Sequence, residues 1–375
     1  MPTNDSHMPE KRHFYWLDWI RFLAAFMVMT AHARGGNWVE WARLAPDDHT
    51  RFVQAFFTVT RAGLEWGIVF FVLSGFLVGG QALERSLHRT FDPYAYARDR
   101  ISRIWLPLIP ALLLTAGVQL FCGTSISFPI MLGNIFGLNG VLCPTFGNND
   151  PLWSLSYEMW FYALAGIAAI ILTRFSSRTM LWAALTLCLA VFTRLNATFL
   201  DCWLLGAFSY FLSSYKRGAS IGVPGLILFL LGACFSQLQA ESKSVSLESI
   251  WPWLPSPELA WLIESLGIGL VLAGVCHGKP RSARWSRIEG LGTWLASFSY
   301  TLYLTHYPIL AVWDRLLPQR HVQVDVPTFL IFFCKIASCL AVAWLMYLPF
   351  EAQTSKVRKW LKEHFSSLAP EKESS

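Results

Sequence analysis

Long apolar runs separated by short polar segments dominate the pattern of hydrophobic and polar positions along the chain. A helix needs roughly 20 mainly apolar residues to cross about 30 Å of hydrocarbon. About ten runs approach this length, and Pro, Gly and charged residues separate them. We therefore predict an all-α, polytopic membrane protein with about ten transmembrane helices. The predicted spans are 16–33, 62–83, 104–122, 152–173, 179–193, 198–213, 221–238, 258–276, 291–312 and 327–349.

The overall composition supports this fold class. Hydrophobic residues make up 54% of the 375 positions, and charged residues only 14%. Soluble domains carry about 25% charged residues, so this chain has too few to cover a water-facing surface. The balance excludes disordered chains, coiled coils, disulfide scaffolds and ordinary cytosolic enzymes.

The distribution of Lys and Arg predicts the orientation of the chain. If the N-terminus is cytoplasmic, 20 of the 30 basic residues fall in cytoplasmic segments and 8 on the opposite side. This bias predicts that both termini are cytoplasmic. The net charge of +6 is therefore a topology signal, and we predict no nucleic-acid partner.

Three segments follow from this reading of the chain. Residues 1–15 form a cytoplasmic N-terminal segment, 16–350 the membrane domain and 351–375 a cytoplasmic tail. Trp360, Leu361 and Phe365 recur at helical spacing, which predicts a short amphipathic helix along the membrane surface. A frayed tail after Phe365 is the alternative.

The cysteines show no metal-binding or redox spacing. The chain has neither a CxxC pair nor a His/Cys ligand pattern, so we predict no bound metal. Cys122 and Cys143 flank the same non-cytoplasmic loop and could pair if that side is oxidising. No phosphate-binding glycine loop of the ATPase type is present, which argues against transport driven by ATP hydrolysis.

The first predicted span carries two ionisable residues on one face. Arg21 and His32 are eleven residues apart, which is about 20° past three helical turns and roughly 16 Å along the axis. Asp18 precedes Arg21 by three residues and can pair with it. Ionisable groups inside a span are candidates for function. His32 can act as a general base, and Arg21 suits recognition of phosphate or carbonyl oxygens.

A second basic pair precedes the third span. Arg100 and Arg103 are three residues apart and face the same way on a helix. A cytoplasmic helix entrance also favours anionic phosphates. The alternative interpretation is the ordinary enrichment of Arg in cytoplasmic loops.

The start of the fourth span combines aromatic and polar side chains. Trp153, Ser156 and Tyr157 share a helix face, and Glu158 can pair with Tyr162 one turn later. A carboxylate inside an apolar run needs a partner or a function. Glu158 could orient an imidazole or bind sugar hydroxyls, and the aromatic rings could contact sugars or form a membrane-interface belt.

The ninth span carries a polar line of Ser299, Tyr303 and His306 on one helix face. A lone histidine here is more often a hydrogen-bonded core residue than a catalytic group. Pro308 follows His306 and should kink the helix, which can open room for a ligand.

Together these segments resemble the acyltransferase-3 family of integral-membrane O-acyltransferases. The resemblance extends from about Leu17 to Phe350. The chain departs from the family pattern in the basic motif, where Asp99 interrupts the arginines and Pro107 lies four residues after Arg103. The matching motifs are Leu17-Asp18-x-Ile20-Arg21-x-x-Ala24-Ala25 followed by His32, Gly67-Ile68-Val69-Phe70-Phe71-Val72-Leu73-Ser74-Gly75-Phe76-Leu77, Trp153-Ser154-Leu155-Ser156-x-Glu158, and Ser299-Tyr300-x-x-Tyr303-Leu304-x-His306-x-Pro308.

The resemblance implies a multi-pass enzyme of the bacterial inner membrane that moves an acyl group to a carbohydrate or glycolipid hydroxyl. It implies acyl-CoA, with acetyl-CoA the expected form, as a donor substrate rather than a permanently bound cofactor. It also implies that His32 is the essential catalytic residue, either as a base or as a transient acyl carrier. The donor-side residues implied are Arg21, Arg100 and Arg103.

For the acceptor side we predict Glu158 as a second catalytic residue and Trp153, Ser156, Tyr303 and His306 as binding residues. Proteins of polysaccharide synthesis are possible partners. Two other functions stay open at this point. A proton-coupled transporter or exporter would also use ionisable groups in its spans, although no internal repeat is evident. A non-catalytic scaffold for a polysaccharide-synthesis complex is the third.

Overall fold

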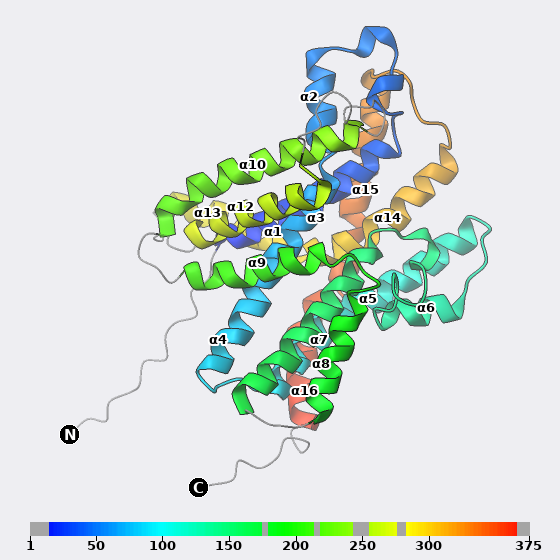
Figure 1. The fold of residues 1–375 in the computed structure, drawn as a ribbon. Helices are drawn as coiled ribbons and strands as arrows, with labels where there is room; N and C mark the ends of the chain where they lie inside the picture. The colour runs from blue at the N-terminus through cyan, green and yellow to red at the C-terminus, as the bar shows by residue number, and fades with distance from the viewer. Residues whose placement is uncertain (1–14, 175–178, 214–217, 243–254, 276–282, 366–375) are drawn as a thin grey trace.

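The computed structural model describes residues 15–174, 179–213, 218–242, 255–275 and 283–365, and every named element in these ranges is helical (Figure 1). The predicted N-terminal segment 1–15 therefore lies almost wholly outside the described residues. The first half contains α1 (Tyr15–Gly35), α2 (Arg51–Thr60), α3 (Gly63–Ser74), α4 (Gln81–Leu87), α5 (Pro93–Phe121), α6 (Phe128–Ile135) and α7 (Leu152–Arg174). The second half contains α8 (Thr179–Val191), α9 (Thr198–Leu212), α10 (Gly218–Ser242), α12 (Pro257–Val275), α13 (Ala283–Ser297), α14 (Ser299–Leu316), α15 (Val326–Tyr347) and α16 (Thr354–Phe365).

Short irregular helices join these elements. A π-helical segment, η3 (Gly75–Gly80), continues α3 directly into α4. The 3₁₀ turns are η1 (Trp41–Arg43), η2 (Pro46–Asp48), η4 (Phe146–Asn148) and η5 (Glu351–Gln353).

The all-α class predicted from the sequence is confirmed over the described residues. Two shorter apolar helices, α8 and α9, coincide with predicted spans 179–193 and 198–213. The count of ten spans and the cytoplasmic location of both termini stay predictions. Six helical stretches in the described ranges are long and apolar enough to cross a membrane: Arg51–Leu87, Pro93–Phe121, Leu152–Thr173, Ser220–Gln239, Pro257–Val275 and Val326–His364.

The predicted ninth span, 291–312, is interrupted in the structure. α13 ends at Ser297 and α14 begins at Ser299, because the backbone of Phe298 leaves the helical region (φ −110°, ψ 8°). The Phe298 ring is buried against Phe22 of α1 and Trp344 of α15. The break between α13 and α14 thus lies at a buried aromatic residue, and hydrophobic periodicity alone did not predict it.

α1 lies between two hydrophobic clusters. The first cluster joins α1 to α3, η3, α7, α8, α9 and α12, with Phe161 and Trp203 at its centre. The second joins α1 to α2, α14 and α15 around Met29, Trp38 and Phe332. Because α1 contributes to both, it joins the two clusters.

The glycines of η3 permit close contact with α9. A Cβ at Gly75 would overlap the carbonyl oxygen of Trp203, and one at Gly206 would overlap the carbonyl oxygen of Val72. Backbones that approach this closely pack without intervening side chains. The contact fixes the position of η3, which forms one wall of the cavity described below.

Cys122 and Cys143 are free thiols in the structure. The tail predicted as a helix is α16, which packs against the N-terminal part of α5. Its location on the membrane surface stays a prediction, and residues 366–375 lie outside the described residues.

Candidate functional site

A cavity of about 270 Å³ lies where α1, α3, η3, α5, α7 and α14 meet. Its wall brings together residues predicted for the acyl-donor side and for the acyl-acceptor side. The wall also includes Ser74 of α3, Gln81 of α4, and Tyr162 and Ser154 of α7. The residues that the sequence predicted and the cavity contains are Arg21, Arg100, Arg103, Glu158 and Tyr303. We call this space the arginine cavity.

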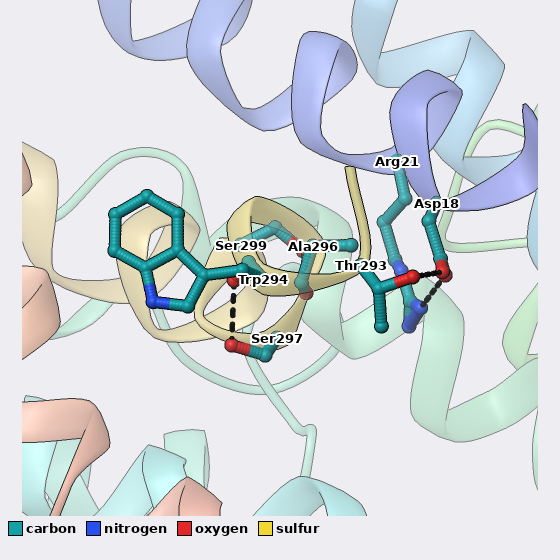
Figure 2. Close-up of polar contacts among 7 residues, drawn as sticks. All are labelled: Asp18, Arg21, Thr293, Trp294, Ala296, Ser297 and Ser299. Atoms are coloured by element: carbon teal, nitrogen blue, oxygen red, sulfur yellow. Dashed lines mark hydrogen bonds and ion pairs between the residues drawn. The ribbon is translucent and has the colours of Figure 1, made fainter. Parts of the chain in front are cut away.

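Arg21 is oriented by the carboxylate predicted to pair with it (Figure 2). Its Nη2 donates to Asp18 Oδ1 at 3.2 Å, and Thr293 Oγ1 of α13 donates to Asp18 Oδ2 at 2.9 Å. The Nε of Arg21 is buried and has no hydrogen-bond partner among the described residues. One side of the guanidinium is thus fixed by Asp18, and a donor remains for a bound group.

Arg100 and Arg103 enter the cavity from α5 over aromatic rings. The Arg100 guanidinium lies 5.2 Å from the ring centre of Tyr162, and that of Arg103 lies 6.0 Å from the ring centre of Tyr300. Aromatic faces hold a guanidinium without consuming its N–H donors. The Nε of Arg100 has no partner in the part of the chain that the structure describes. Arg100 therefore retains a donor for an anion.

Glu158 faces the same cavity and accepts a hydrogen bond from the Tyr162 hydroxyl, as the spacing of the two residues predicted. Ser74 Oγ donates to the Tyr162 hydroxyl at 3.4 Å. The carboxylate is therefore held by α7 itself, with α3 as a second support.

Asp99, the residue that departs from the family's basic motif, pairs with the C-terminal helix. Its Oδ1 lies 2.9 Å from Nε of Arg358 in α16. The negative charge between Arg98 and Arg100 is thereby matched by a cation from α16. This ion pair accounts for the acidic residue within an otherwise basic segment.

The two histidines predicted from separate spans lie side by side. His32 is in the last turn of α1 and His306 is in α14, and their ring centres are 5.4 Å apart with planes tilted by 32°. His306 is fully buried, whereas His32 is partly exposed. We call these two side chains the histidine pair.

The hydrogen bonding of His306 indicates which of its ring nitrogens carries a proton. Nδ1 lies 3.1 Å from the carbonyl oxygen of Leu302, which can only accept, so Nδ1 carries a proton. Nε2 is buried without a partner among the described residues. In the neutral imidazole this nitrogen holds a lone pair that can accept a proton.

Tyr303 lies between the arginine cavity and the histidine pair. It lines the cavity, and its ring centre is 5.9 Å from that of His306. Its hydroxyl is bonded to Ser154 Oγ at 2.6 Å and to the carbonyl oxygen of Pro151 at 3.1 Å. The side chain is therefore fixed from α7 and touches both parts of the site.

Sequence reasoning missed an acidic residue beside the histidine pair. The Tyr307 ring meets His32 edge-on at 5.1 Å, and its hydroxyl donates to Asp150 Oδ2 at 2.9 Å. Tyr307 directly follows His306, and Asp150 directly precedes the Pro151 that α14 contacts. The sequence signal for Tyr307 was its position next to the predicted His306. The hydrogen bond between Tyr307 and Asp150 depends on tertiary structure and was not predictable from spacing.

Trp153 and Ser156 are predicted acceptor residues that the structure does not bring to the cavity wall or the histidine pair. Trp153 packs against Phe71 and Phe199, with ring centres 5.8 and 5.2 Å away. Ser156 is fully buried and donates to the carbonyl oxygen of Gly137 at 2.6 Å. Helical periodicity gave these residues a shared face, and that face packs against the protein interior.

In the described ranges, no group of three or more His, Cys, Asp or Glu side chains has the arrangement of a metal site.

A family model described as an acyltransferase domain matches residues 14–348. The matched range contains the arginine cavity and the histidine pair. The search of the curated proteins and the search of the solved structures each gave no match. Because the model covers most of the chain, and because the motif residues converge on one cavity and one histidine pair, the chain belongs to the acyltransferase-3 family.

Proposed function

We propose that this membrane acyltransferase moves an acyl group from cytoplasmic acyl-CoA to a hydroxyl of a cell-envelope or exported carbohydrate in the bacterial inner membrane. One observation carries the proposal. Three arginines line a cavity that Tyr303 connects to a pair of histidines. Arg21 lies in the second turn of α1 and His32 in its last turn, so one helix links both parts.

The arginines form the donor side of this proposal. Arg21, Arg100 and Arg103 present guanidinium groups to one cavity, and guanidinium groups bind phosphate oxygens with directed hydrogen bonds. The unpartnered Nε atoms of Arg21 and Arg100 are available for such bonds. We assign the phosphates of CoA to this end, which the orientation predicted from the sequence places near the cytoplasm. Acetyl-CoA is the expected donor.

The histidines form the reacting side. A hydroxyl oxygen of the acceptor attacks the thioester carbonyl carbon, and His32 takes the hydroxyl proton as general base. The carbon–sulfur bond then breaks, and the proton passes to the leaving sulfur, so that CoA departs as the thiol. His306 Nε2, with its free lone pair, is placed to exchange a proton or a hydrogen bond beside His32. Glu158 and Tyr303 contribute to the space between donor and acceptor.

A second route uses His32 as a transient acyl carrier. In that route His32 attacks the thioester, CoA leaves as the thiol, and the acceptor hydroxyl then displaces the imidazole. Rapid quench of the purified protein into denaturant at neutral pH, with acyl-labelled acetyl-CoA as the donor, separates the routes. Label on the protein, absent in His32→Ala, indicates the carrier route, whereas unlabelled protein during turnover indicates direct transfer.

The test of the function compares surface glycans and purified protein. Mass spectrometry of envelope and exported glycans, with and without the wild-type gene, reports the added mass and the modified sugar. Wild-type membranes should transfer label from acetyl-CoA to glycan, and His32→Ala membranes should not. His88→Ala is the matched control, because His88 is exposed at the end of α4, and it should retain activity. Equal glycan acylation in wild-type and His32→Ala cells would contradict the proposal.

A further inference from the structure

α15 contacts the backbone beside each member of the histidine pair. Lys335 is 2% exposed, and its Nζ donates to the carbonyl oxygen of Gly36 at 2.8 Å. One turn later on α15, Cys339 Sγ lies 3.6 Å from the carbonyl oxygen of His306 itself. α15 therefore contacts the backbone close to His32, through Gly36, and at His306 itself.

The Lys335 contact falls at the end of the helix that carries His32. Gly36 directly follows α1, and its N–H donates to the carbonyl oxygen of His32 at 2.9 Å. The last carbonyl groups of a helix carry partial negative charge and lack partners within the helix. A buried ammonium group at this point holds the final turn of α1 against α15.

The second neighbour of Lys335 is Asp314, near the end of α14. Its Oδ1 lies 3.8 Å from Lys335 Nζ, and its side chain is 53% exposed. A Cβ placed on Gly36 would lie 3.0 Å from Asp314 Oδ1, so the carboxylate also sits against this turn. The lysine thus joins the ends of α1 and α14, while the carboxylate remains accessible to solvent.

We infer that Lys335 is a positioning residue that sets the separation of His32 from His306. The inference rests on the proposed function, because it gives the histidine pair a catalytic role. An ionisable residue in a membrane span is costly and is retained where it makes a specific contact. Here the contact is with the backbone four residues beyond His32. Lys335 itself touches neither ring and transfers no proton.

A rival role for Lys335 is to neutralise Asp314 without positioning α1. The two roles differ in what a second substitution does. If charge balance alone matters, Asp314→Asn removes the need for the lysine and restores the Lys335→Met enzyme. If the bond to Gly36 matters, Asp314→Asn restores nothing, because the carbonyl group remains without its donor.

The experiment uses the full chain in lipid nanodiscs and measures transfer from acetyl-CoA. Lys335→Met should lower kcat about 10- to 100-fold, the loss expected from an angstrom-scale displacement of a catalytic group. The KM for acetyl-CoA should change by less than about threefold, because the substitution leaves the arginines of the cavity in place. Lys335→Arg should recover much of kcat, whereas Lys335→Met with Asp314→Asn should not. Wild-type kcat in Lys335→Met, or recovery in the double variant, would overturn the inference.

A second readout does not depend on acyl transfer. Diethyl pyrocarbonate modifies accessible imidazoles, and mass spectrometry of peptides reports the rate at each histidine. In Lys335→Met the rate at His32 should rise severalfold relative to that at exposed His88, while an unchanged ratio counts against positioning. If wild-type protein transfers no acyl group, the proposed function fails, and this ratio still decides the role of Lys335. Should Lys335→Met fail to accumulate, Lys335→Gln, which keeps a shorter N–H donor, is assessed by the same criteria.

Discussion

The Tyr303 hydroxyl lies 2.6 Å from Ser154 Oγ, and this bond joins α14 to α7 at the boundary between the arginine cavity and the histidine pair. Tyr303→Phe keeps the ring against His306 but removes its bonds to Ser154 and to the Pro151 carbonyl oxygen. We expect kcat to fall about tenfold, with a smaller change in KM for acyl-CoA, because the ring loses the two hydrogen bonds that fix its position and each such bond contributes about 0.5–1.5 kcal/mol.

The measurement is initial-rate kinetics of purified protein with labelled acetyl-CoA. Tyr347→Phe is a suitable control, since Tyr347 stacks on Trp344 of α15 and does not line the cavity. A Tyr303→Phe enzyme whose kinetics match those of the control would show that the hydroxyl has no part in the reaction.

His306 should be needed for activity together with His32. We expect His306→Gln to lower kcat/KM about 10²-fold, the lower range for loss of an acid–base group. Because the rings are 5.4 Å apart and act on one reaction, the loss should appear in kcat more than in KM for acyl-CoA. A wild-type kcat/KM in purified His306→Gln protein would show that His306 has no part in the reaction.

Arg100 and Arg103 should govern donor affinity. A hydrogen bond to a charged group contributes about 1.5–3 kcal/mol, so Arg100→Ala or Arg103→Ala should raise KM for acyl-CoA about 10- to 100-fold. The increase should shrink at high salt, which screens charge interactions. Arg98→Ala is the matched control, because Arg98 lies on the same helix outside the cavity wall. If all three substitutions raise KM equally, the effect comes from general positive charge and not from the cavity.

Local periodicity predicted the contacts within one helix. The pairing of Arg21 with Asp18 and of Glu158 with Tyr162 was readable from spacings of three and four residues, and both contacts are present. The separation of Arg21 and His32 by roughly 16 Å along one helix was predicted from the same geometry. Helix geometry is fixed by the backbone, so these relationships need no knowledge of neighbouring helices.

Contacts between different helices could not be predicted from the sequence. His32 and His306 were each selected as polar residues in spans, but nothing in their spacing indicated that they meet. Trp153 and Ser156 show the opposite case, because their shared face packs inside the protein. Lys335 lies within the predicted span 327–349, and nothing in its spacing indicates its contact with Gly36. Such contacts depend on which helix faces which, and one hydrophobic pattern is compatible with many arrangements.

The Gly75 contact gives a stability prediction with an internal control. A Cβ at Gly75 would overlap the carbonyl oxygen of Trp203, and a backbone group cannot rotate away as a side chain can. Gly75→Ala should therefore destabilise the protein by about 1–3 kcal/mol and lower its melting temperature in detergent. It should also displace η3 and so reduce donor binding, since Leu77 and Val78 of η3 line the cavity.

Gly117→Ala is the matched change, because Gly117 lies in α5 and a Cβ there would meet nothing within 4 Å. Alanine has the higher helix propensity, so this variant should be as stable as wild type or up to about 1 kcal/mol more stable. Equal melting temperatures for the two variants would show that α9 and η3 can separate freely. A lower melting temperature in Gly75→Ala alone supports a rigid contact between the two backbones. This contact holds η3, and with it one wall of the cavity, in place opposite the arginines.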